Sequence, residues 1–319
     1  MPFDAEKFIA GAIEEIRASV GHEKAIIAVS GGVDSSVAAA LCARALGKNI
    51  RCVFVETGLM RKDEAKKVKT SLLGAGVGLR IADAQEDFFR ALKGLSDPEK
   101  KRKAIGGAFI RVFEREAKSF GAKFLVQGTI APDWIESGSG LRATIKSHHN
   151  VGGLPEKMGM SLVEPLRELY KDEVRKVGAA LGLPESLYKR QPFPGPGLAV
   201  RIMGEVTRGK AETVREACAI TEEEIERAAA EGKMALPWQY FAVLLPIRTV
   251  GVLGDARAYG HTIAVRAVES QDGMTAKACP VPLEVLERIS DRVTRELKEH
   301  VNRVVYDVTS KPPGTIEWE

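Results

Sequence analysis

Short apolar runs alternate with longer amphipathic stretches over the first 190 residues. The runs typical of buried strands lie at 25–29, 50–55, 79–83 and 124–129. The stretches with helical periodicity lie at 3–20, 62–73, 85–92, 97–120 and 171–181. This alternation predicts an α/β fold with a doubly wound parallel sheet. Ligands of such sheets bind at the carboxyl ends of the strands, so we expect 30–36, 56–61 and 127–133 to meet at one edge.

The rest of the chain has a different pattern. Residues 190–198 hold three prolines and two glycines within six positions, which is typical of an interdomain linker. We therefore expect a nucleotide-binding domain at 1–190 and a second domain at 191–319. Strand-like runs lie at 199–203, 241–247, 261–268 and 301–308, and helical stretches at 210–231 and 282–300. This half predicts a smaller α+β domain with helices on one side of its sheet and an edge suited to homodimerisation.

Composition narrows the class of protein. The chain has 319 residues, of which 45% are hydrophobic and 28% charged, as in soluble globular proteins. No apolar run is long enough to span a membrane, and the first residues lack a signal-peptide pattern. The four cysteines have no metal-site spacing and are expected to be reduced thiols in the cytoplasm. The net charge of +4 suits anionic nucleotides and does not require nucleic acid.

The stretch Ser30-Gly31-Gly32-Val33-Asp34-Ser35-Ser36 lies between an apolar run and a strong helix former. Glycines permit a tight turn, and the free N–H groups at a helix start attract phosphate. A carboxylate beside phosphate needs an intervening cation, so Asp34 indicates Mg²⁺. The stretch has no lysine, so it is not a Walker loop, and it does not match the GxGxxG motif. The alternative is an ordinary glycine–serine turn without a ligand. The complete seven-residue string between a strand and a helix favours the phosphate-binding loop over that alternative.

A glycine-rich segment at 135–162 is too long for an ordinary connection and predicts a lid. Lys146 is placed to neutralise phosphate charge during transfer; the alternative is a solvated lysine. His148 and His149 are adjacent and have no third partner, which argues against a metal site.

Two further sets of charges are candidates for substrate contacts. Four cations at 100–103 begin the helix at 97–120; we interpret most of them as a solvated basic face, with one or two facing an anionic substrate. In the C-terminal tail, Lys311 could meet a phosphate and Glu317 could accept a hydrogen bond from a base N–H.

Specific strings then connect the whole chain to one family. They are SGGVDSS at 30–36, VFVETGLMR at 53–61, VQGTIAPDWIES at 126–137, IKSHHNVGGLP at 145–155, PFPGPGLAVRI at 192–202, VGVLGDARAY at 250–259 and KPPGTIEWE at 311–319. The first resembles the pyrophosphate loop of ATP pyrophosphatases in general. Together they resemble the ATP-pyrophosphatase subunit of GMP synthetases, in the form whose glutaminase is a separate polypeptide.

The resemblance implies that ATP adenylylates xanthosine 5′-monophosphate (XMP) with release of pyrophosphate, and that ammonia then displaces AMP to give GMP. It implies ATP and pyrophosphate contacts by the loop residues, with Val55 and Gly128 touching adenine or ribose. It assigns catalytic roles to Asp34 and Lys146, with Asp34 holding Mg²⁺. The XMP contacts that it implies are Arg102, Gln239, Asp255, Lys311, Ile316 and Glu317. No glutaminase motif surrounds any cysteine, so a partner glutaminase subunit would supply the ammonia.

Two other functions stay open at this point. NAD synthetase or a tRNA-modifying enzyme would share the loop, but the first does not explain the C-terminal tail. The thiolating enzymes would need paired catalytic cysteines and a more basic surface, which the chain lacks. A regulatory protein that senses nucleotides without catalysis is the second alternative, and Asp34 and Lys146 argue against it. Release of pyrophosphate discriminates among them, because each enzyme would require a different acceptor.

Overall fold

The computed structural model describes residues 3–132, 159–188, 190–271 and 273–319. Two compact units are present. Unit 1 comprises Met1–Glu56, Asp63–Ala84 and Gly107–Arg190, and unit 2 comprises Thr57–Lys62, Gln85–Gly106 and Gln191–Glu319. Lys146 and residues 135–158 of the proposed lid lie outside the described residues, whereas residues 161 and 162 of that segment belong to a strand, Ser161–Val163.

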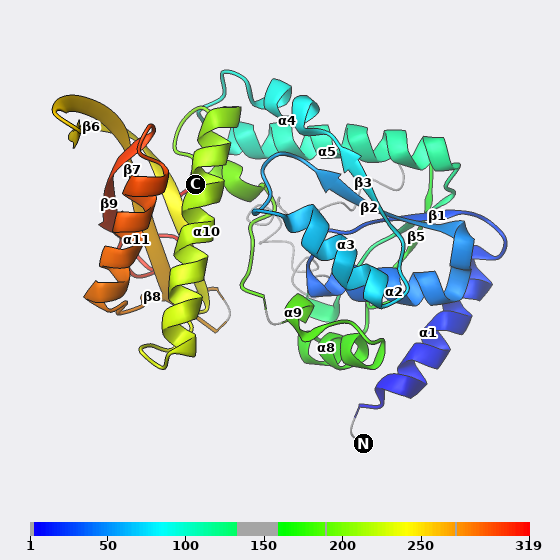
Figure 1. The fold of residues 1–319 in the computed structure, drawn as a ribbon. Coiled ribbons are helices and arrows are strands. Elements are labelled where there is room, and N and C mark those ends of the chain that lie inside the picture. The colour runs from blue at the N-terminus through cyan, green and yellow to red at the C-terminus, as the bar shows by residue number, and fades with distance from the viewer. Residues whose placement is uncertain (1–2, 133–158, 189, 272) are drawn as a thin grey trace. The chain divides into compact units, whose positions relative to one another are not determined.

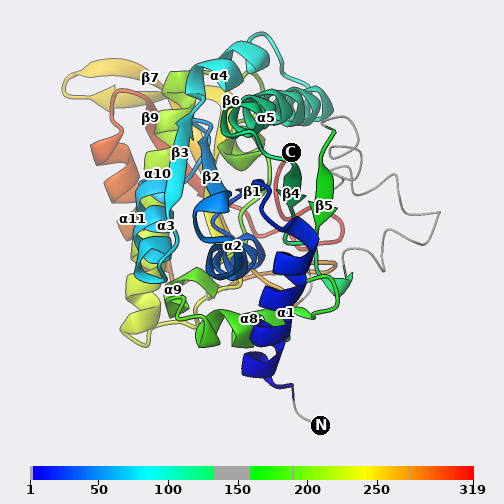
Figure 2. The same cartoon turned by 90° about the vertical axis from the view of Figure 1, so that its right-hand side faces the viewer.

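Unit 1 is built on a five-stranded sheet. Its strands are β1 (Ala25–Ala28), β2 (Ile50–Glu56), β3 (Leu79–Asp83), β4 (Phe124–Val126) and β5 (Ser161–Val163). They lie in the order β3-β2-β1-β4-β5 (Figure 2), and every pair is parallel. Chain order reverses between β1 and β4, so this is the topological switch point of the sheet. The predicted doubly wound parallel sheet is confirmed.

Helices cover both sides of this sheet. In its described residues, unit 1 has the helices α1 (Ala5–Val20), α2 (Val33–Leu46), α3 (Glu64–Gly74), α8 (Lys171–Ala180), α9 (Glu185–Tyr188) and the 3-10 helix η1 (Gly47–Asn49). Of these, α1, α2 and α8 pack together on one side, while the later part of α5 (Pro98–Phe120) runs along the other (Figure 1). The interior of α2 is almost wholly apolar and buried, which explains why it fixes the loop before it firmly.

Unit 2 contains a smaller mixed sheet. Its strands are β6 (Gln239–Leu253), β7 (Ala256–Glu269), β8 (Lys277–Ala278) and β9 (Val301–Tyr306), where β6 and β8 pair antiparallel with β7 and β9 pairs parallel with it. The helices α10 (Arg208–Ala230) and α11 (Leu283–Glu296) pack on one face (Figure 1). The unit also holds α4 (Gln85–Leu92) and the first turns of α5. The predicted α+β architecture is confirmed.

One strand prediction is wrong. Residues 199–203 were expected to form a strand, but Gly197–Arg201 is the 3-10 helix η2. Gly197 has φ +65°, and an added Cβ would lie 2.3 Å from the carbonyl oxygen of Leu59. Leu198 N–H donates to that same oxygen at 2.7 Å, which fixes the turn. An apolar run alone cannot distinguish a buried helical turn from a buried strand.

The interpretation of the cations at 100–103 is wrong for Lys101. Its side chain is fully buried, and its ammonium pairs with Glu319 and donates to the carbonyl of Ile202 at 2.7 Å. Burial lowers the pKa of Lys101, although the hydrogen bond and charge of Glu319 oppose this change. The lysine therefore fixes the C-terminal tail to the start of α5.

The structure bears on two expectations, the absence of a membrane-spanning run and the reduced state of the cysteines. Among the residues that the structure describes, no helix is both long and apolar enough to cross a bilayer. All four cysteines are unpaired and buried, as expected for reduced thiols.

Candidate active site

The loop between β1 and α2 is folded by its own hydroxyls. Ser30 N–H donates to the Ser35 hydroxyl at 3.3 Å, and the Ser36 hydroxyl donates to the Gly32 carbonyl at 2.8 Å. Gly31 has φ +83°, a conformation that side chains avoid. The N-cap residue Gly32 makes no side-chain capping bond, so N–H groups at the start of α2 keep their capacity to bind an anion.

A cavity of about 480 Å³ opens beside this loop. Ser30, Gly32, Asp34 and Ser35 line one side, and residues 125–130 at the end of β4 line another. The cavity thus lies at the carboxyl ends of β1 and β4, where the sheet reverses direction. The loop approaches β4 closely, because a Cβ on Gly128 would lie 3.0 Å from the carbonyl carbon of Asp34.

The cavity has one apolar wall. Phe109 and Phe113 of α5 stack on each other with ring centroids 6.1 Å apart, and Leu125 and Ile130 complete the apolar lining. Phe113 is buried and Phe109 is half-buried. A polar, anion-binding side that faces an apolar side suits a nucleotide, which carries a charged phosphate chain and an aromatic base.

The two oxygens of Asp34 have different surroundings. Oδ2 accepts a hydrogen bond from Lys171 Nζ at 2.5 Å, whereas Oδ1 is buried and has no hydrogen-bond partner. A buried, unpartnered carboxylate oxygen is costly unless a cation or donor compensates it. Asp34 thus fits a Mg²⁺ ion held by one carboxylate and the phosphates of a substrate. No group of three or more potential metal-ligating side chains occurs among the described residues, so a metal site built from protein ligands alone has no support there.

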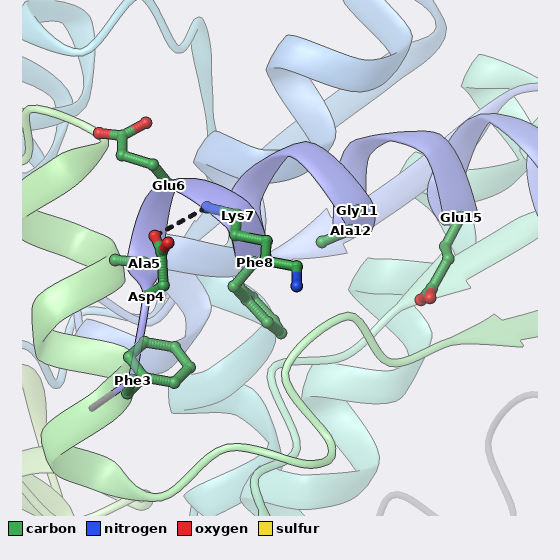
Figure 3. Close-up of a pocket in the computed structure, with 9 residues that line it drawn as sticks. All are labelled: Phe3, Asp4, Ala5, Glu6, Lys7, Phe8, Gly11, Ala12 and Glu15. Atoms are coloured by element: carbon green, nitrogen blue, oxygen red, sulfur yellow. Dashed lines mark hydrogen bonds between the residues drawn. The ribbon is translucent and has the colours of Figure 1, made fainter. Parts of the chain in front are cut away.

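A larger hollow, of about 970 Å³, lies along the first turns of α1 (Figure 3). Its lining comes from residues 3–15 only, with Phe3 and Phe8 supplying the apolar part. The carboxylate of Asp4 accepts from Lys7 N–H at 3.1 Å and caps the helix. These side chains serve the helix itself and gather no set of reactive groups, so the loop cavity is the better candidate.

The other predicted ATP contacts lie at different places relative to the loop cavity. Gly128 lies against the loop, as expected for a backbone contact. Val55 is buried near the end of β2, on the far side of β1 from β4, and is not part of the cavity lining in the described part of the chain. Val33 and Ser36 are buried in the first turn of α2 and support the loop from within.

The structure joins two of the predicted XMP contacts directly. Gln239 Nε2 donates to Glu317 Oε1 at 2.9 Å. The neighbouring Ile316 is held by its carbonyl oxygen, which accepts from Arg266 Nε at 2.8 Å. Arg102 follows Lys101, the partner of Glu319, and forms a weak ion pair with Glu99 at 3.8 Å. The tail, β6 and the start of α5 therefore lie side by side within unit 2.

The other two predicted XMP contacts, Lys311 and Asp255, lie away from Gln239 and Glu317. Lys311 Nζ donates to the Gly273 carbonyl at 2.7 Å, at the other end of the tail. Asp255 is exposed at the turn between β6 and β7, whereas Gln239 is the first residue of β6. The strand between them has 15 residues, and at about 3.3 Å per residue it separates the two positions by tens of ångströms. One chain does not bring Asp255 to Gln239.

Sequence reasoning missed several residues of these regions. Lys171 stands at the start of a predicted helix, where its position resembles that of an ordinary surface lysine. Phe109 and Phe113 are four residues apart on α5, a spacing that indicates only an apolar helix face. Arg201, fully buried beside Glu317, lies in a run whose pattern predicts a strand. Lys171 lies at the amino end of α8 after β5, at the carboxyl edge of the sheet, but this place could not be predicted because β5 shows no apolar run.

Comparison with known proteins decides the family. The family model described as NAD synthase matches residues 4–97, and the model described as GMP synthase C terminal domain matches residues 223–318. The chain is 61% identical over 315 residues to one subunit of the GMP synthase [glutamine-hydrolyzing] of Pyrococcus furiosus, covering 98% of this chain and 97% of that protein. The chain belongs to the GMP synthase family.

Other relatives agree with this placement. The corresponding subunit from Methanopyrus kandleri is 58% identical over 318 residues, covering 99% of this chain and all of that protein. The GMP synthase [glutamine-hydrolyzing] of Clostridium perfringens is 59% identical over 309 residues, which are 96% of this chain but only 60% of that longer protein. The chain therefore corresponds to one portion of the longer GMP synthases and to a whole subunit of the others.

Proposed function

We propose that this chain is the ligase subunit that forms GMP from XMP. ATP transfers AMP to the C2 oxygen of XMP and releases pyrophosphate; ammonia then attacks C2 and AMP leaves. Activation is needed because the oxygen of a urea-like carbonyl is a poor leaving group, whereas AMP is a good one. The observation that supports this proposal best is the cavity at the switch point, where an anion-binding loop, Asp34 and an apolar wall meet.

The loop would hold the phosphate chain of ATP. Its N–H groups, the start of α2 and the hydroxyls of Ser30 and Ser35 are donors for the phosphate oxygens. The wall formed by Phe109 and Phe113 would pack against a purine ring. Catalysis by such a site consists mainly of positioning and charge compensation.

Asp34 and Lys171 would change partners when ATP binds. In this structure Lys171 compensates Asp34, and both side chains are partly exposed. Mg²⁺, when bound at Asp34, supplies the charge compensation that a carboxylate beside phosphates requires. Lys171 would then be released toward the phosphates. Lys146 stays a predicted lid contact.

The C-terminal tail would hold XMP. Gln239, Ile316 and Glu317 are gathered there, and Arg102 lies next to Lys101. Lys311 is the predicted phosphate contact. Asp255 stays a predicted XMP contact that one chain does not bring to Gln239.

A separate glutaminase subunit would supply the ammonia. A glutaminase nucleophile must be an accessible thiolate. Burial raises the pKa of both Cys42 and Cys52 to about 12, and all four cysteines are buried. These thiols are suited to packing and not to glutamine hydrolysis. A cytoplasmic location and a homodimer formed through residues 191–319 belong to the same proposal.

The test is release of pyrophosphate from the purified chain with ammonium chloride as the ammonia source. We expect release only when ATP, Mg²⁺ and XMP are all present, with GMP and AMP formed in equal amounts. Release with deamido-NAD in place of XMP would support NAD synthetase instead. Binding of nucleotides without release would support a regulatory protein.

A further inference from the structure

Arg201 is a fully buried arginine that the proposed reaction has not yet used. It ends the 3-10 helix η2, and its side chain has no exposed surface. The guanidinium lies over the rings of Phe241 and Phe193, at 4.1 Å and 5.1 Å from their centroids. A buried cation of this kind must be compensated by a nearby negative charge.

The compensating charge is Glu317. Arg201 Nε donates to Oε2 at 3.1 Å, and an Nη donates to Oε1 at 2.8 Å, so the pair is bidentate. Gln239 supplies a third donor, to Oε1 at 2.9 Å. Glu317 itself is 18% exposed. Its carboxylate therefore has a fixed plane and one open side.

A count of lone pairs shows what remains for a ligand. A carboxylate offers about four acceptor positions, two on each oxygen. Arg201 and Gln239 occupy both positions on Oε1, and Arg201 occupies one on Oε2. One position on Oε2 is left, and an ionised carboxylate can only accept. The group that completes this site must be an N–H or O–H donor.

We propose that Arg201 is a positioning residue of the XMP site, which holds the carboxylate of Glu317 turned so that Oε2 accepts a ring N–H of the substrate. This rests on the proposed function. Xanthine carries lactam N–H groups, whereas the corresponding ring nitrogen of adenine is an acceptor. Arg201 thus acts on base selection through Glu317 and does not touch the reacting atoms.

The surroundings keep the charges of this pair in place. Burial opposes the charge of Arg201, but the carboxylates of Glu317 and Glu222 raise its pKa above the usual value, so it stays protonated. Cys218 lies 3.9 Å from Nη1 of Arg201, and burial raises the pKa of its thiol. Within the described residues, Glu317 on the tail and Cys218 and Glu222 on α10 are the titratable groups that act on Arg201.

The experiment compares Arg201→Met with Arg201→Lys in pyrophosphate release, with kcat and KM measured separately for XMP and for ATP. Loss of a charged hydrogen-bond donor costs about 10- to 100-fold in binding, so Arg201→Met should raise KM for XMP by that factor. KM for ATP should change less than about twofold. The kcat for XMP-dependent release should change less than KM for XMP, because Arg201 does not touch the reacting atoms. Arg201→Lys restores the charge but not the two parallel hydrogen bonds, so it should restore KM for XMP in part.

The control is Arg266→Lys. Arg266 is also fully buried, but it holds the tail through the carbonyls of Thr309, Thr315 and Ile316 and through Asp307. Its replacement should lower the melting temperature and weaken XMP binding, because it loosens the whole tail. A wild-type chain without XMP-dependent release would overturn the proposed function itself. A working wild type whose Arg201 variants keep the same KM for XMP would overturn only the inference.

Arg201→Lys is the milder of the two variants, and it tests the inference if Arg201→Met does not fold. If Arg201→Met does not fold, Arg201→Lys decides, because a lysine cannot form the two parallel hydrogen bonds of the guanidinium. We then expect a KM for XMP raised by about 3- to 10-fold with KM for ATP unchanged. An unchanged KM for XMP in that folded variant would contradict the role of Arg201.

Discussion

The charge of Asp34 is only partly compensated by the protein. Lys171 contacts one carboxylate oxygen, and the other oxygen is buried without a partner. The ion pair with Lys171 is partly exposed, so it stabilises the fold by at most about 1 kcal/mol. A contribution to folding therefore does not explain this arrangement, whereas the proposed binding of Mg²⁺ at Asp34 would.

Asp34→Asn should remove activity while leaving the fold intact. We expect pyrophosphate release to fall at least about 100-fold, because the amide cannot compensate Mg²⁺ beside phosphate. The melting temperature should stay close to that of the wild type. Asp172→Asn is the matched control, since Asp172 is 72% exposed on α8 and pairs only loosely with Lys176, at 3.9 Å. Equal activity of the two variants would contradict the role of Asp34.

His261 gives the fold a pH dependence. Burial lowers its pKa, with the charge of Arg248 acting in the same direction, and Nδ1 is buried without a partner. The unfolded chain, with a histidine pKa of about 6.5, then binds a proton more readily than the folded chain. The free energy of unfolding should therefore fall as the pH drops through about 6.5 toward the folded value.

Urea unfolding at about pH 7.5 and about pH 5.5 checks this, because the two values lie on either side of the unfolded histidine pKa. His261→Phe should reduce the difference between the two midpoints. His300→Gln, a change at an exposed histidine, should leave the difference as in the wild type. An unaltered difference in His261→Phe would show that other groups cause the pH dependence.

At the scale of elements, the end of β4 and the start of α2 fit together only because residue 128 is glycine. A Cβ there would lie 3.0 Å from the carbonyl carbon of Asp34 and 3.1 Å from the nitrogen of Ser35. Both atoms belong to the backbone of the first helical turn, which is fixed by the buried interior of α2. If a Cβ at residue 128 pushed the first turn of α2 away, the loop before that turn would move with it.

Gly128→Ala should thus destabilise the fold by about 1–3 kcal/mol, as overpacking does. It should also raise KM for ATP by about tenfold, because the loop donors are displaced. Gly11→Ala in α1 is the control: open space surrounds it, and alanine should stabilise the helix by about 0.5–1 kcal/mol. An unchanged KM for ATP in Gly128→Ala would show that the loop tolerates the shift.

The elements also differ in how well the sequence alone predicted them. The unit from β1 to α2 was predictable because its run, turn and helix are local in sequence. The strand β5 was missed because three residues, two of them exposed, show no apolar run. The outer part of the β6–β7 hairpin was missed because residues such as Val252 and Asp255 are exposed and lack strand alternation.

Some residues of the candidate site could also be predicted from local sequence, and others could not. The loop and Gly128 were predictable because short motifs carry them, and the lid lysine stays a prediction. Lys171 and Asp34 are 137 residues apart, and Lys101 and Glu319 are 218 apart. No periodicity or spacing connects residues at such separations, so these pairs become visible only once the chain is folded.

At the scale of the whole molecule, we propose the β6–β7 hairpin as the part of residues 191–319 that forms the homodimer surface. Its exposed apolar residues include Ile247, Val250, Val252 and Tyr259, with Val252 81% exposed. Val252→Asp should therefore convert the dimer to a monomer, as measured by sedimentation velocity. Leu73→Asp, a similar change at a 66% exposed leucine of α3, should leave the dimer intact. A dimer that survives Val252→Asp would place the interface elsewhere.

The length of the β6–β7 hairpin has a consequence for Asp255. The strand β9 pairs with β7 only from His261 to Val265, and its Asn302 side chain holds Thr249 through two hydrogen bonds of 2.7 Å. In the described chain, the part of the hairpin beyond these contacts has strand pairing only between β6 and β7. A lone two-stranded ribbon is marginally stable in water, and its amides should exchange quickly with deuterium in dilute solution. The proposed XMP site at Gln239 lies out of reach of the Asp255 on the same hairpin. If Asp255 contacts XMP as predicted, that XMP must be bound by a neighbouring copy, and complementation between two differently inactivated chains would test this.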